Sequence, residues 1–468
     1  MKKLLFAVML MSCSFSVFSQ ELKQVHAPDA LPGVEPEMLT PAYWISLQDN
    51  PDAVIMTPGE IAAFNEKNRT REVVFRDYYG RPNPLERQFA ETLMKGPVMH
   101  LLEPLNLPER LPADSLRVRL KLNMEWLYSR DFYDNRNAPY DDSMRQRIVN
   151  DMDIDSIPDE IVRRYGIVVK RADVRHYPTA VPGFSETKWE LDFFQATALY
   201  TGNPVAVIHR SKDGAFLYVE SPVSRGWVAA ETIAFAKKDE IRAIIENPDF
   251  LMATGDKITV WGDPSFTDFC QYLYCSATVP LLKMNSSFYI VRLPYRKPEG
   301  SLGMTEAYVK PDADVHIGYL PYTKRNVITQ YFKLLNLPYG WADQQNKRDC
   351  SGIQRVVLCC FGIKTGRHPS FILSSSDHQY FVNPDLTAEE KKAEIAKLDP
   401  IITLAGNSGH IVMYLGKARN GQQYFYHQGG WGYDADGVHY IVNRVSINSF
   451  DHQWYDVNRP NVFTTFKK

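Results

Sequence analysis

One cysteine in the last third of the chain has the surroundings that a catalytic thiol needs. Cys350 begins a segment in which side chains of apolar type recur at helical spacing, at Ile353, Val356, Val357 and Cys360. Gly362 stands where such a helix would end. The pattern predicts a helix with Cys350 at its N-terminus. There, unpaired N–H groups and the helix dipole favour the thiolate, which is the form that attacks a carbonyl carbon.

Two histidines downstream of Cys350 can serve the thiol as a base, because an imidazole can take up its proton and later protonate a leaving amine. His410 begins an apolar strand, and the Asn420-Gly421 turn predicts a hairpin that returns the chain to His427. We expect His427 to lie near His410 and to fix its tautomer through a hydrogen bond. Isolated Cys and His residues are more often structural, so these residues alone leave both interpretations open.

The rest of the chain must position these residues, and its sequence pattern changes twice. Helices and loops dominate up to about residue 155. Within this region, Thr57-Pro58-Gly59-Glu60 is typical of a capped helix start. Short apolar runs separated by turns such as Asp213-Gly214 then predict two small antiparallel barrels, at 156–245 and 246–318. The final region, 319–468, combines helices and strands and contains the thiol and both histidines.

Residues 1–19 have the features of a secretory signal peptide, with Lys2 and Lys3 before an apolar run and Ser19 as the small residue before cleavage. An alternative is a lipoprotein box that ends in Cys13 and carries a lipid anchor. We favour plain secretion because apolar residues continue past Cys13. No later stretch is apolar enough for long enough to cross a bilayer as a helix. We expect export to the periplasm or the cell surface.

Charge and cysteine content argue against other classes of function. The chain has 53 Lys and Arg against 55 Asp and Glu, without a basic block, so nucleic acid is not an expected partner. Its 6 cysteines are few for a disulfide scaffold, and their spacing lacks the paired ligands of a metal site. Cys270 and Cys275 either form a disulfide or remain free thiols. We expect Cys359 and Cys360 to be structural.

Three segments together resemble the NlpC family of papain-like cell-wall cysteine peptidases. They are Asp349-Cys350-Ser351-Gly352, Gly409-His410 at the start of a strand, and Pro338-Tyr339-Gly340-Trp341 ahead of the thiol. Gly226-Trp227-Val228 is similar to a strand of bacterial SH3-like domains. The resemblance implies a multidomain α+β chain. It would consist of a helical N-terminal domain at 20–155, two SH3-like barrels, and a papain-like catalytic domain at 319–468.

The resemblance also implies an activity, the hydrolysis of the bond between γ-D-Glu and the diamino acid of peptidoglycan stem peptides that begin with a free L-Ala. Cys350 would be the nucleophile and His410 the acid and base. His427 would take the third catalytic position, with Gln428 as the alternative, and no metal or organic cofactor would be needed. We expect the enzyme to be a monomer.

Residues that match substrate-contacting positions of the family follow from the same resemblance. Asp349 and Ser351 correspond to positions at the L-Ala end of the substrate, although Asp349 would equally serve as a helix N-cap. The segment 374–379 resembles an Arg-Asp-Ser segment without its Arg, and gives Ser375 and Ser376 as candidates. Further candidates are Tyr218 and Asp192 in the first barrel and Tyr339 as an oxyanion donor.

Two other functions fit the same residues. The chain could be a different cysteine amidohydrolase, such as a muramyl-L-alanine amidase, because a Cys-His pair does not specify the bond. It could also be a cell-wall-binding protein with an idle catalytic domain.

Overall fold

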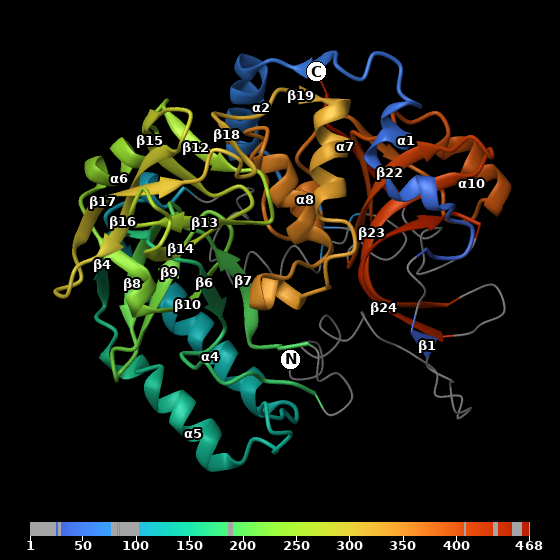
Figure 1. The fold of residues 1–468 in the computed structure, drawn as a ribbon. Coiled ribbons are helices and arrows are strands. Elements are labelled where there is room, and N and C mark those ends of the chain that lie inside the picture. The colour runs from blue at the N-terminus through green and yellow to red at the C-terminus, as the bar shows by residue number, and fades with distance from the viewer. Residues whose placement is uncertain are drawn as a thin grey trace.

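The computed structural model describes residues 25–26, 30–75, 82, 84, 103–185, 191–406, 409–433, 439–451 and 461–467. The predicted signal peptide and Cys13 lie outside the described residues. Within these ranges the chain forms three seven-stranded sheets and two two-stranded ones. Figure 1 shows the sheet that contains β5 to β11 next to the sheet that contains β12 to β18. Helices α7 and α8 lie between the second of these sheets and the C-terminal sheet that contains β22 to β24.

The first barrel is a sheet in the order β11-β5-β8-β9-β10-β6-β7. Its apolar centre includes Val168, Leu199 and Val219. The Asp213-Gly214 turn joins β8 to β9 as predicted, with Gly214 at a φ of +74° that favours glycine. Its strands are β5 (Arg164–Val168), β6 (Ala172–Arg175), β7 (Gln195–Leu199), β8 (Pro204–Arg210), β9 (Phe216–Glu220), β10 (Arg225–Ala229) and β11 (Ile233–Phe235).

The second barrel follows helix α6 (Lys238–Ile245) and has the order β14-β13-β17-β16-β15-β12-β18. The predicted Asn285-Ser286-Ser287 turn connects β15 to β16. Its strands are β12 (Phe250–Ala253), β13 (Lys257–Trp261), β14 (Phe269–Tyr274), β15 (Thr278–Met284), β16 (Tyr289–Arg296), β17 (Leu302–Val309) and β18 (Val315–Ile317).

The C-terminal part contains a sheet in the order β1-β24-β23-β22-β21-β25-β20, against which helix α8 packs. Its helices are α7 (Lys324–Lys333), η5 (Trp341–Asn346), α8 (Cys350–Cys359), α9 (Pro369–Leu373) and α10 (Ala388–Ile395). Its strands are β1 (Val25–His26), β20 (Gln379–Phe381), β21 (Thr403–Gly406), β22 (Ile411–Lys417), β23 (Gln423–Tyr433), β24 (His439–Ser449) and β25 (Val462–Thr465). These elements confirm the α+β multidomain class.

The N-terminal segment divides between two parts of the molecule. Helix α1 packs against α7, and β2 pairs with β19, which directly precedes α7. Helices α4 and α5 instead share an apolar cluster with Tyr218 and Trp227 of the first barrel. In Figure 1, α1 and α2 accordingly lie beside the orange and red elements, and α4 and α5 lie below the green barrel. The remaining bounds are η1 (Pro36–Leu39), α1 (Pro41–Ile45), β2 (Val54–Met56), α2 (Pro58–Thr70), η2 (Pro104–Asn106), β3 (Arg110–Pro112), α4 (Asp114–Tyr128), α5 (Asp142–Asp151), η3 (Ile154–Ser156), β4 (Glu160–Val162), η4 (Ala230–Thr232) and β19 (Tyr322–Thr323).

Candidate active site

Cys350 is the first residue of helix α8, as the apolar spacing predicts. Asp349 caps the helix, because its Oδ1 accepts a hydrogen bond from the Gly352 N–H at 2.8 Å. Cys350 itself is 8% exposed. The helix ends before Gly362, which adopts a φ of +78°. The thiol therefore lies at the positive end of a capped, buried helix.

Strand β22 brings His410 to this thiol. The Ile411 N–H, next to His410 in the chain, donates a hydrogen bond to the Cys350 sulfur. The β22–β23 hairpin turns at Asn420-Gly421 and places His427 across from His410, with 4.7 Å between the two ring centroids. The structure thus brings together the three residues that the sequence singled out.

The neighbours of His427 distinguish it from Gln428. Successive side chains of a strand point to opposite faces of the sheet, and the Gln428 amide donates to the carbonyl oxygens of Pro338 and Arg348. Gly429 leaves room for the imidazole, because a Cβ at that position would lie 2.3 Å from Cε1 of His427. The geometry therefore places His427, and not Gln428, beside His410.

Burial sets the protonation states of Cys350, His410 and His427. It raises the pKa of the Cys350 thiol to about 12, and the Asp349 carboxylate acts in the same direction. It lowers the pKa of His410 to about 4 and holds the pKa of His427 well below its ordinary value. At neutral pH the free protein therefore contains a thiol and a neutral imidazole, which is the form of a histidine that can accept the proton.

We expect the acid limb of kcat/KM to have its midpoint near pH 4 instead of near 6.5. Because burial lowers the pKa of His410, the base stays neutral, and active, until the pH falls to about 4. Between pH 6.5 and 4 the unfolded chain binds more protons than the folded one at this residue, so stability decreases as the pH falls through that window. Rates from pH 3.5 to 8, with a return to pH 7 as the control for unfolding, test this expectation. A midpoint near 6.5 would contradict it.

Arg367 connects to the residues on both sides of the thiol. Its Nη2 donates to Asp349 Oδ2 at 2.7 Å, and its Nη1 donates to the Ser351 hydroxyl at 2.6 Å. Its Nε donates to Asp343 Oδ2 at 3.2 Å and to the Thr197 hydroxyl of strand β7 at 3.0 Å. Arg367 therefore links the catalytic helix, segment η5 and the first barrel.

Two buried carboxylates share this guanidinium. Burial opposes the charge of Arg367, but Asp343 and Asp349 outweigh it and raise the pKa of the guanidinium. Burial also opposes the charge of Asp349, yet Arg367 holds the pKa of that carboxyl below its ordinary value. For Asp343 burial prevails and raises the pKa. The stronger pair is therefore Arg367 with Asp349.

Segment η5 carries Asp343 in a conformation that sequence patterns do not reveal. Four of its residues have a left-handed φ between +50° and +63°, namely Ala342, Asp343, Gln345 and Asn346. The Ala342 N–H donates to Asp349 Oδ2 at 3.1 Å, and Arg171 of the first barrel donates to the Asp343 carbonyl. Trp341 packs against Phe193. These contacts hold the segment between the barrel and the N-terminus of α8.

The structure does not bring the other sequence candidates to the thiol in the same way. The hydroxyls of Ser375 and Ser376 are buried and donate to the carbonyl oxygens of Ile372 and Thr465. Tyr218 is 1% exposed, and its ring packs on Trp227. These three side chains are occupied inside the protein.

Asp192 and Tyr339 lie closer to the catalytic helix. The Asp192 carboxylate pairs with Arg175 at 2.8 Å, and its N–H donates to the side chain of Gln344 in η5. Tyr339 is half-buried and pairs through its backbone with Arg348, two residues before Cys350. Asp192 therefore borders the segment that carries Asp343, and Tyr339 borders the start of α8.

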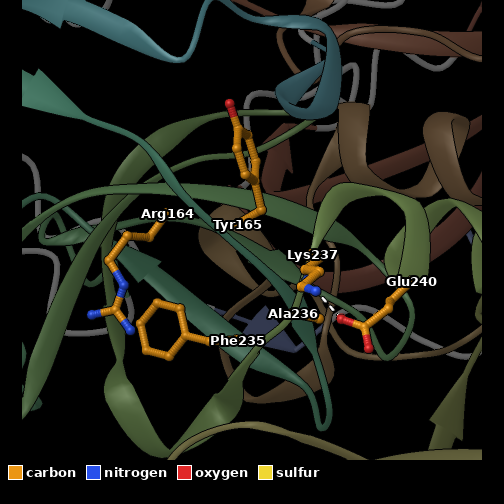
Figure 2. A pocket seen from close by; sticks show the side chains of 6 residues that line it. All are labelled: Arg164, Tyr165, Phe235, Ala236, Lys237 and Glu240. Carbon is orange, nitrogen blue, oxygen red and sulfur yellow. Dashed lines mark hydrogen bonds between the residues drawn. The ribbon is translucent and has the colours of Figure 1, made fainter.

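A separate depression lies on the first barrel and shares no lining residue with this site. Arg164, Tyr165, Phe235 and Glu240 are among the residues that line it (Figure 2). The Arg164 guanidinium stacks on Phe235 at 3.8 Å, and the Lys237 N–H donates to Glu240 at 2.8 Å. The Arg164 guanidinium and the Glu240 carboxylate are thus both in contact with other lining residues of the depression.

Neither a metal cluster nor a spanning helix occurs in the part of the chain that the structure describes. In those residues no three His, Cys, Asp or Glu side chains gather as a metal site would require. In the same residues, no helix has the combination of length and apolar character that crossing a bilayer demands.

Comparison with solved structures assigns the fold. An NlpC/P60 endopeptidase from Photobacterium damselae subsp. piscicida aligns with 91% of this chain and 92% of its own, at a TM-score of 0.68 and 18% identity. This chain shares the NlpC/P60 endopeptidase fold. Residues 182–229 match the family model of an SH3 domain of the SH3b1 type. This range contains strands β7 to β10 of the first barrel.

Two further solved structures align at TM-scores below 0.5, and the fold assignment does not rest on them. An NlpC/P60 family protein from Bacillus cereus ATCC 10987 aligns with 62% of this chain and 97% of its own at 17% identity, with a TM-score of 0.44. NlpC2 from Trichomonas vaginalis aligns with 63% and 99% at 17% identity, with a TM-score of 0.22. No curated protein sequence matches this chain.

Arg367 and Asp343 are the site residues that sequence reasoning missed. The segment 374–379 lacks the Arg of the family segment that it resembles, and Arg367 lies upstream of it, just before α9. Asp377 of that segment instead pairs with Lys67 and Arg71 of the N-terminal region. A signal for Arg367 was its charge in the short segment between two helices, but no residue type pointed to Asp343.

Proposed function

We propose that this chain is an exported cysteine endopeptidase that hydrolyses the bond between γ-D-Glu and the diamino acid of peptidoglycan stem peptides. The observation that carries the proposal is the Cys350 thiol at a capped helix N-terminus, against the Ile411 N–H and next to the His410–His427 pair. The NlpC/P60 fold and the SH3b1-type match support the choice of cell-wall peptide as the substrate.

In the proposed reaction, His410 takes the proton of Cys350 as the sulfur attacks the γ-carbonyl carbon. The Cys350 N–H at the start of α8, with Tyr339 as a second donor, stabilises the oxyanion. His410 then returns the proton to the leaving amine of the diamino acid, and a thioester remains. Water, activated by His410, hydrolyses the thioester. His427 orients the His410 ring throughout.

We further propose that the cluster of Asp343, Asp349, Ser351 and Arg367 borders the subsite for the L-Ala end of the peptide. Two carboxylates pair directly with one guanidinium, so the cluster has one carboxylate more than it has directly bound cations. A substrate ammonium would supply the missing positive charge, and this favours peptides with a free N-terminal amine. The residues that hold this cluster together come from the first barrel as well as from the catalytic domain.

The test compares two substrates with purified protein, L-Ala-γ-D-Glu-diaminopimelate and its muramyl-linked counterpart, and identifies the products by mass spectrometry. We expect release of the free diamino acid, faster from the tripeptide with the free amine. Release of the intact tripeptide from the muramyl-linked substrate would indicate an amidase instead. Retention of both substrates on the protein without cleavage would favour a binding protein.

A further inference from the structure

A second pair of sulfur atoms lies outside the active site, at the contact between the second barrel and helix α8. Cys275 follows β14 in the turn to β15, and Cys360 is the C-cap of α8. Their sulfur atoms are 3.8 Å apart, and the residues are 1% and 0% exposed. Both are free thiols in the structure. We propose that Cys275 and Cys360 form a disulfide that joins the second barrel to the catalytic helix.

The geometry favours this pair over the one that the sequence left open. A disulfide has an S–S length of about 2.05 Å, so the two sulfurs have to approach by less than about 2 Å. Cys270 and Cys275 are instead separated by five steps along an extended strand, which is about 17 Å and beyond the reach of a disulfide. Cys270 is also exposed, whereas Cys275 is buried.

The surroundings make Cys275 the attacking thiol. The hydrogen bond between the two sulfurs and the nearby Arg348 guanidinium lower the pKa of Cys275, and burial opposes them. The same hydrogen bond and burial raise the pKa of Cys360. The thiolate is the nucleophile of thiol–disulfide exchange, so Cys275 is the thiol favoured to react first once the barrel begins to dock and brings Arg348 near it, and Cys360 then resolves the intermediate.

The reaction needs a disulfide donor, either a small-molecule disulfide or a protein oxidant of the exporting compartment. The Cys275 thiolate attacks one donor sulfur and forms a mixed disulfide, which releases the first donor thiol. The Cys360 sulfur then attacks Cys275 and releases the second donor thiol. Two electrons and two protons pass from the protein thiols to the donor, which becomes two thiols. Both residues are buried, so the exchange takes place as the barrel docks on α8 during folding.

The bond would add a covalent link to an interface that combines a shared apolar cluster with ion pairs. At the other end of α8, Arg348 pairs with Asp256 of the second barrel. Lys333 of α7 pairs with Asp314 at 2.6 Å. A cavity beside the Arg348–Asp256 pair is also lined by Tyr274 and Ile353, among others, so the interface is not closely packed throughout. The disulfide would fix the C-terminal end of the helix whose N-terminal residue is the nucleophile.

The test oxidises the full chain with oxidised glutathione during refolding, in a Cys350→Ala background that removes the catalytic thiol, and maps peptides by mass spectrometry without reduction. We expect a linked Cys275–Cys360 peptide pair that disappears on reduction. Cys275→Ser and Cys360→Ser abolish it, and Cys270→Ser, the matched control, retains it. We also expect reduction to lower the thermal midpoint by about 5 °C in the Cys270→Ser protein but not in the Cys275→Ser protein.

Two results would overturn the proposal. In one, both cysteines remain fully alkylatable after oxidation and denaturation. In the other, Cys275 links to Cys359 or Cys270 instead of Cys360. Peptide mapping reads either result even if a serine variant loses stability.

Discussion

Replacing Cys350 with alanine should lower kcat/KM for stem-peptide hydrolysis by at least about 10⁴-fold. The substitution removes the sulfur that accepts the hydrogen bond from the Ile411 N–H, so the nucleophile is lost and no thioester can form. The burial of the site and the cap of α8 should survive, because alanine fits where a thiol was buried. Release of diaminopimelate, followed by mass spectrometry, measures the loss.

Cys359→Ala is the matched control for this variant. Cys359 ends the same helix, and we expect its replacement to leave kcat/KM unchanged within about twofold. His410→Ala should resemble Cys350→Ala, because the neutral thiol then has no base. If Cys350→Ala has the same kcat/KM as the wild-type protein, the thiol mechanism is excluded and the chain is a hydrolase of another type.

The positions of Cys350, His410 and His427 were predictable because each depends on a local pattern. The apolar residues of α8 fix which side of the helix faces the core, and the Asp349 cap fixes where the helix begins. The Asn420-Gly421 turn fixes the pairing of β22 with β23, and the pairing brings His427 next to His410. These steps are local, whereas the approach of Cys350 to His410, which lies far along the chain, was expected only from the family resemblance.

The charged cluster could not be predicted in this way. It joins Thr197 of the first barrel, Asp343 of η5 and Arg367 before α9, and the contact exists only after the barrel has docked. The docking depends on a run of left-handed residues for which Ala342 and Gln345 give no sign in the sequence. Long-range packing therefore decides the part of the site that we propose binds the substrate end.

Substrate contacts of hydroxyl side chains are hard to predict from the sequence for a related reason. A serine that contacts a substrate and one that donates to a backbone carbonyl have the same appearance in the sequence. Ser375 and Ser376 take the second role. Ser351 differs because Arg367 reaches its hydroxyl from another segment. Only the folded chain separates these roles.

Replacing Arg367 with methionine should destabilise the protein by about 3–5 kcal/mol, the second large effect that the structure predicts. Methionine keeps much of the side-chain volume, but Asp343 and Asp349 lose their shared cation while they remain buried. Removing one partner of a buried ion pair costs far more than the pair contributes, because the remaining charges are left without compensation. Urea unfolding at pH 7, followed by tryptophan fluorescence, gives the change in unfolding free energy.

A surface pair provides the matched control for Arg367→Met. Arg325 binds Asp52 through two hydrogen bonds of 2.5 and 2.8 Å, but these side chains are 44% and 69% exposed, whereas that of Arg367 is 11% exposed. Arg325→Met should therefore cost less than about 1 kcal/mol. Adding Asp343→Asn to Arg367→Met should recover part of the lost stability, since one of the two uncompensated charges disappears with it. If Arg367→Met is no more harmful than Arg325→Met, water reaches the carboxylates in solution and Arg367 does not act as the buried counter-charge of this cluster.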